Sequence, residues 1–138
     1  MLIKDAMTPN PEYITPDKTV QQAAERMRDL DVGMIPVGDG VKLKGIITDR
    51  DIVVRSTAEG KDPKEAEASS AMTPDILYLF EDQELDDAVQ TMKDKQVRRI
   101  IILNRDKDMT GVLAMADLAN RSGDESEIAE ALEGVSEH

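Results

Sequence analysis

The hydrophobic positions of this chain follow a helical spacing that occurs twice. Apolar residues recur at i, i+3, i+4 and i+7 from Val20 to Met27, the apolar stripe of an amphipathic helix. Thr19 and Gln22 have the spacing of a capping box at its start. The same stripe returns 65 residues later and predicts a second helix over 84–95.

Short apolar runs between turn signals predict the strands. The sequences MIPV at 34–37 and KGIIT at 44–48 flank GDG at 38–40, a pattern typical of two strands joined by a turn. Further helices are expected from Asp49 to about Ala58 and from Met115. The other expected elements are short extended pieces at Tyr13–Ile14 and Tyr78–Leu79, strands over 99–103 and 111–114, and a turn over 104–110.

These elements belong to an internal repeat. DAMTPNPEYI at 5–14 returns as SAMTPDILYL at 70–79, a shift of 65 residues, and the later pair Asp51 and Asp117 is shifted by 66. Each copy therefore reads strand, helix, strand, strand, helix. We place copy one at 1–58, a charged and alanine-rich linker or loosely held helix at 59–70, copy two at 71–122, and an acidic tail at 123–138 in which Ile128, Leu132 and Val135 share one weak helical face.

Composition narrows the functions that remain. The formal net charge of −12 disfavours binding to nucleic acid and to anionic lipid. There is no cysteine, and the one histidine is His138, so thiolate and imidazole metal sites are not expected. No apolar run approaches the length of a membrane span, so we expect a cytoplasmic protein. No nucleophile has a base beside it, and we expect no enzymatic activity.

The ordered, duplicated set AMTP, TVQQAAERM, DVGMIPV and GIITDRDI resembles a tandem pair of CBS domains, the cystathionine beta-synthase type repeat, joined as a Bateman module. Small stand-alone bacterial members of the hypoxic response type are similar. The resemblance implies an α+β fold of two βαββα repeats packed about a pseudo-twofold axis, and a flat homodimer. It also implies clefts between the repeats that bind an adenosyl ligand such as AMP, ADP, ATP or S-adenosylmethionine, with no required cofactor.

The sequence GIITDRD at 45–51 carries the candidate site. A strand ending at Thr48 and a helix starting at Asp49 would leave unpaired backbone N–H groups facing outward, which suits an anion. The Thr48 hydroxyl adds a donor for phosphate, and the Asp51 carboxylate suits two vicinal ribose hydroxyls. The alternative is that Thr48 and Asp51 only cap the helix.

Copy two departs from this motif. Asp117 is kept, but Ala114 stands where Thr48 does, and Arg98 and Arg99 align with a glycine and a methionine of copy one. The resemblance implies that these arginines approach Thr48 and Asp51, where guanidinium groups suit phosphate, that Asp117 marks an emptier cleft, and that adenine lies against Ile76–Tyr78. Alternatively, both arginines are exposed partners of the many acidic residues.

Two functions stay open from the sequence. The first is a regulatory module that binds an adenosyl ligand between its repeats and passes the signal to an effector protein that the sequence does not identify. The second is a structural or interaction homodimer whose clefts bind no ligand. The apolar run IVV at 52–54 exceeds what one buried helix face needs, and it suits a second copy of the chain under either function.

Overall fold

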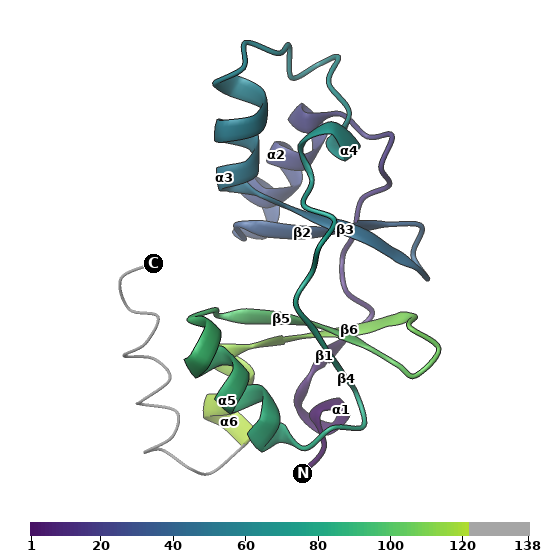
Figure 1. Ribbon diagram of the computed structural model, residues 1–138, viewed down its shortest axis with the longest axis vertical. Coiled ribbons are helices and arrows are strands. Elements are labelled where there is room, and N and C mark those ends of the chain that lie inside the picture. Colours follow the sequence, from purple (N-terminus) through teal and green to yellow (C-terminus); the bar gives the residue numbers. More distant parts are fainter. Residues whose placement is uncertain (122–138) are drawn as a thin grey trace. The chain divides into compact units, whose positions relative to one another are not determined.

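The structure is a computed structural model that describes residues 1–121, with side chains through Leu118. The predicted acidic tail lies outside the described residues. The chain forms two compact units (Figure 1). Unit 2 is Glu12–Ile76, and unit 1 joins Met1–Pro11 to the chain from Leu77 onward.

Unit 2 is a β-hairpin with helices, as the sequence predicts for copy one. The β2 and β3 strands are antiparallel, with Met34 opposite Thr48. The expected helix from Asp49 is present, but its second half has π-helical hydrogen bonding, with the Ala58 N–H donating to the Val53 carbonyl at 2.8 Å. The elements are α2 (Val20–Leu30), β2 (Met34–Gly38), β3 (Leu43–Thr48), α3 (Asp49–Ile52), η1 (Val53–Thr57) and α4 (Ala68–Ala71).

Unit 1 contains a four-stranded sheet in the order β1-β6-β5-β4, with β4 parallel to β5 and the other pairs antiparallel. Its strands and helices include those predicted for copy two, but β6 begins at Met109, inside the turn predicted over 104–110. The elements are α1 (Ile3–Ala6), β1 (Thr8–Pro9), β4 (Tyr78–Phe80), α5 (Leu85–Lys95), β5 (Arg99–Leu103), β6 (Met109–Ala114) and α6 (Met115–Arg121).

The predicted capping box of α2 is confirmed. The Gln22 N–H donates to the Thr19 hydroxyl oxygen at 3.1 Å, and the Thr19 N–H donates to the Gln22 side-chain oxygen at 2.9 Å. The helix ends at Asp31, whose φ of 55° is left-handed. Local sequence therefore determines where this helix starts, while its buried side chains Val20, Ala23 and Met27 determine which face packs inward.

The segment that opens each copy packs in the unit built mainly from the other copy. In unit 1, Thr8 and Pro9 pair with Val112 and Gly111, and Figure 1 shows α1 beside α5 and α6. In unit 2, the Thr73 N–H donates to the Ile46 carbonyl at 2.7 Å, and the Ile46 N–H donates back at 3.0 Å. The two AMTP segments thus play equivalent structural roles in exchanged positions.

The end of the expected linker over 59–70 belongs to the core. Ala68–Ala71 form α4, and Ala68 and Ala71 are fully buried. The Val20 N–H donates to the Ala66 carbonyl at 2.8 Å, which ties this segment to the start of α2. The compact units divide the chain differently from the sequence repeats. The boundaries given to the two repeats therefore stay predictions.

Each unit has its own apolar core, and the opening segments contribute to both. In unit 1, Ile3 and Ala6 are buried with α5 and β5. In unit 2, Ala68 and Ala71 occupy the corresponding place. The remaining core is mostly aliphatic, with Met27 in unit 2 and Met92, Met109 and Met115 in unit 1, so flexible methionines fill space in a chain with only 2% aromatic residues.

Gly45 allows the close approach of the second AMTP segment. A Cβ at this position would lie 2.8 Å from the Thr73 carbonyl oxygen and 3.0 Å from the Met72 sulfur. We therefore expect Gly45→Ala to lower the free energy of unfolding by about 1–3 kcal/mol, since the backbone of Thr73 must shift to relieve the overlap. Denaturant unfolding measures this change, and unaltered stability would contradict the close packing.

Candidate functional site

The candidate site of unit 2 lies where β3 ends and α3 begins. The Asp51 N–H donates to the Thr48 hydroxyl oxygen at 3.0 Å, and the Thr48 N–H donates to the Asp51 Oδ2 atom at 3.0 Å. The two side chains are thus fixed beside each other by a reciprocal capping box. Thr48 and Asp51 therefore do cap the start of α3.

The backbone N–H groups at this junction are already paired. The Asp49 N–H donates to the Gly33 carbonyl at 3.0 Å, and the Arg50 N–H donates to the Asp49 carboxylate at 2.8 Å. The Asp51 N–H is bonded to Thr48. The expectation of unpaired N–H groups facing an anion is therefore wrong, and a phosphate here would have to be met by side chains.

Asp51 makes two further contacts that the sequence analysis missed. The Thr73 hydroxyl donates to Asp51 Oδ1 at 3.3 Å and Oδ2 at 3.4 Å, and Arg55 Nε lies 3.7 Å from Asp51 Oδ1. The Asp51 side chain is only 13% exposed. The i+4 spacing of Asp51 and Arg55 on the predicted helix was an available signal for their contact, whereas the repeated AMTP motif did not indicate that Thr73 reaches this carboxylate.

This arrangement leaves hydrogen-bonding capacity for a ligand. The Thr48 hydroxyl accepts a bond from Asp51, so its own hydrogen can still be donated. A carboxylate has about four acceptor positions, and Asp51 uses some of them for Thr48 and Thr73. The pair can therefore offer one donor and one anionic acceptor to a polyhydroxylated ligand.

The matching junction of unit 1 retains only the carboxylate. The Ala114 N–H donates to Asp117 Oδ2 at 2.8 Å, which reproduces half of the capping box. Arg99 is the cross-strand partner of Ala114, and the Arg98 carbonyl accepts a bond from the Met115 N–H at 2.9 Å. Within unit 1 the structure thus brings both arginines to the Ala114–Asp117 junction.

The side chains of Arg98 and Arg99 are exposed. In unit 2 the equivalent places beside Thr48 are held by Gly33 and Met34. That these arginines approach Thr48 and Asp51 stays a prediction.

The two predicted adenine contacts lie in different units. Ile76 is partly buried at the end of unit 2, and Tyr78 opens β4 in unit 1. The Tyr78 ring packs edge to face on Phe80, with centroids 5.6 Å apart. The Arg105 guanidinium covers Phe80 at 4.1 Å from the ring centroid, so Tyr78 belongs to a small packed aromatic group.

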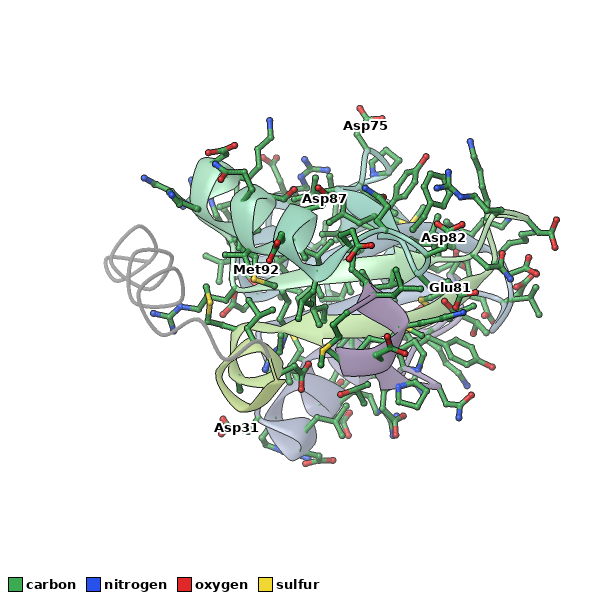
Figure 2. The ribbon with its side chains drawn as sticks, turned by 90° about the horizontal axis from the view of Figure 1, so that it is seen from below. Asp31, Asp75, Glu81, Asp82, Asp87 and Met92 are labelled. Atoms are coloured by element: carbon green, nitrogen blue, oxygen red, sulfur yellow. The ribbon has the colours of Figure 1, made fainter. Side chains whose placement is uncertain are left out.

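Arg105 also binds Asp82. Its Nε atom donates to both carboxylate oxygens, at 3.0 and 2.9 Å. These hydrogen bonds lower the pKa of Asp82 from its ordinary value. Figure 2 labels four exposed aspartates, Asp31, Asp75, Asp82 and Asp87, and the buried Met92. Such acidic residues form a solvated surface.

A separate hollow of about 450 Å³ lies in unit 2 between the Tyr13–Lys18 segment and the exposed face of α2. Its lining includes Lys18 and Arg26 but also Glu25 and Asp29, and Arg26 is paired with Glu12. Because the charges oppose one another and neither Thr48 nor Asp51 takes part, this hollow is not the candidate site.

The described residues contain no group of three or more histidine, cysteine or carboxylate side chains that could hold a metal ion. Within residues 1–121, no helix is both long enough and apolar enough to cross a membrane.

Comparison with known proteins identifies the family. A family model described as the CBS domain matches residues 3–56 and 68–124. The chain is 38% identical over 125 residues to the CBS domain-containing protein YhcV of Bacillus subtilis (strain 168), covering 90% of this chain and 88% of that protein. It is 32% identical over 117 residues to hypoxic response protein 1 of Mycobacterium tuberculosis, covering 84% and 81% of the two chains.

Solved structures agree with this assignment. A crystal structure of hypoxic response protein I with two coordinated zinc ions superposes with a TM-score of 0.77 at 30% identity, covering 88% of this chain and 98% of that one. The structure of CBSX2 in complex with AMP has a TM-score of 0.75 at 24% identity, covering 88% and 95%, and shows the shared fold. With its α+β fold and two matched repeats, this chain belongs to the CBS domain family.

Proposed function

We propose that this chain is a non-catalytic regulatory module that binds an adenosyl ligand of the AMP, ADP or ATP class through Thr48 and Asp51. The observation that carries the proposal is the reciprocal capping box, which holds a hydroxyl and a carboxylate side by side before any ligand arrives. Such preorganisation reduces the entropy lost on binding. A protein of the same fold has been solved with AMP.

The proposed contacts follow the chemistry of each side chain. Asp51 accepts hydrogen bonds from the ribose hydroxyls, and the Thr48 hydroxyl donates to a phosphate oxygen. Because the backbone N–H groups at the junction are paired, the phosphate charge would be met by Arg98 and Arg99. Adenine would contact Ile76 and Tyr78, and S-adenosylmethionine would offer the same adenosine without phosphates.

The test is thermal unfolding in the presence of AMP, ADP, ATP, NAD or S-adenosylmethionine at millimolar concentration. A ligand present at 100 times its dissociation constant stabilises the folded state by about 2.7 kcal/mol. For a chain of this size the melting temperature should rise by roughly 8–15 °C. Unchanged melting with all five compounds would contradict the proposal.

The second candidate is a cytoplasmic homodimer that binds no ligand and acts through its surface. Ala114 in place of a threonine and the net charge of −12 favour it, since a negative surface opposes a triphosphate. Val53 and Val54 are 59% and 48% exposed and could meet a second copy. A dimeric mass in light scattering, together with a melting temperature that none of the five compounds changes, would support this function. In either case the module would act through a separate effector protein or through its own assembly into oligomers.

A further inference from the structure

The Asp51 carboxylate is a meeting point of three segments of unit 2. It accepts a bond from the Thr48 N–H at the end of β3. The Thr73 hydroxyl, from the second AMTP segment, donates to both of its oxygens. Arg55, one helical turn beyond Asp51, places its Nε atom 3.7 Å from Oδ1. The carboxylate is therefore oriented by residues from both copies of the repeat.

Thr73 and Arg55 are themselves held by the backbone. Two hydrogen bonds between Thr73 and Ile46, at 2.7 and 3.0 Å, fix the position of Thr73 beside β3. An Arg55 Nη1 group donates to the Met72 carbonyl at 3.1 Å. The second AMTP segment is thus attached next to Asp51 by its main chain, and its hydroxyl is directed to the carboxylate.

We propose that Thr73 and Arg55 are positioning residues for the ligand-binding carboxylate, an inference that rests on the proposed function of Asp51. A carboxylate that binds two adjacent ribose hydroxyls must present its oxygens in one orientation. Without Thr73 and Arg55, only the Thr48 N–H would restrain the Asp51 side chain among these contacts. The ligand affinity of the copy-one junction therefore depends on a hydroxyl that copy two supplies.

Thr73→Val tests this proposal, because valine keeps the branched shape and backbone pairing while the hydroxyl is lost. We measure affinity by calorimetry with the tightest binder among AMP, ADP, ATP, NAD and S-adenosylmethionine. The expected loss is roughly 2- to 12-fold, because an Asp51 side chain that Thr73 no longer orders must lose its rotamer freedom when the ligand binds. Thr73→Ser keeps the hydroxyl and should restore most of the affinity.

Thr8→Val is the matched control. Thr8 is the repeat equivalent of Thr73 in unit 1, where it is exposed and pairs with Val112 through the backbone. We expect it to leave the affinity unchanged. Equal losses in Thr8→Val and Thr73→Val, or an affinity in Thr73→Val equal to that of the unmodified protein, would overturn the proposal.

A measurement without ligand separates this inference from the proposed function. The Thr48 amide donates to the carboxylate that Thr73 orients, so its hydrogen exchange should become faster in Thr73→Val and in Arg55→Met. The Ile46 amide, bonded to the Thr73 carbonyl, should keep its protection. Faster Thr48 exchange with no ligand binding would refute only the function of Asp51, whereas unchanged Thr48 exchange would refute the positioning role.

Discussion

Replacing Asp51 with alanine is expected to weaken binding of the adenosyl ligand by about 10- to 150-fold. The variant removes the hydrogen bonds that we propose between the Asp51 carboxylate and the ribose, and bonds to charged groups contribute about 1.5–3 kcal/mol. The change also removes the capping contact with the Thr48 N–H, which lowers the stability of the fold. Affinity is therefore measured by calorimetry well below the melting temperature of the variant.

Asp117→Ala provides the matched control for this loss of capping. Asp117 accepts a bond from the Ala114 N–H as Asp51 does from Thr48, so both variants lose this cap, and Asp51→Ala loses the contacts with Thr73 and Arg55 as well. We expect Asp117→Ala to change the affinity by less than about twofold, as for a substitution away from the site. If Asp117→Ala weakened binding and Asp51→Ala did not, the occupied junction would be that of unit 1.

Replacing Ile3 with alanine is expected to lower the free energy of unfolding by about 2–5 kcal/mol, the usual cost of emptying a buried isoleucine site. Ile3 is fully buried against the core formed by α5, β5 and β6. The large effect is expected although the residue lies near the start of the chain, where substitutions are commonly tolerated. Lys4→Ala, exposed on the same short helix, should change stability by no more than about 0.5 kcal/mol.

Hydrogen exchange shows which elements Ile3→Ala destabilises. Because the opening segment packs in unit 1, protection should decrease first in α5, β5 and β6. The amides of α2, β2 and β3 should be less affected. A loss of protection confined to residues 12–76 would contradict the exchange of opening segments between the two copies.

Most of the secondary structure could be predicted because its signals are local. The helical stripe from Val20 and the Thr19–Gln22 cap determine α2, and GDG between two apolar runs determines the β2–β3 hairpin. The exchange of opening segments could not be predicted. The tetrapeptide AMTP is identical at 6–9 and 71–74, so either segment could pair with either hairpin, and the local sequence does not choose between them.

The candidate site was predictable in part. The spacing of Thr48 and Asp51 indicates a mutual contact, which the structure contains. The contact between Thr73 and Asp51 joins residues 22 positions apart and leaves no periodic signal in the sequence. The pairing of Arg99 with Ala114, in contrast, follows from the register of the predicted hairpin and could have been derived.

A crystal structure of the protein grown with its tightest adenosyl ligand tests the central claim most directly. We expect ligand density at the Thr48–Asp51 junction, with ribose hydroxyls at hydrogen-bonding distance from the Asp51 carboxylate and a phosphate oxygen or equivalent acceptor near the Thr48 hydroxyl. Density only at the Asp117 junction, or a bound ligand that touches neither Thr48 nor Asp51, would contradict it.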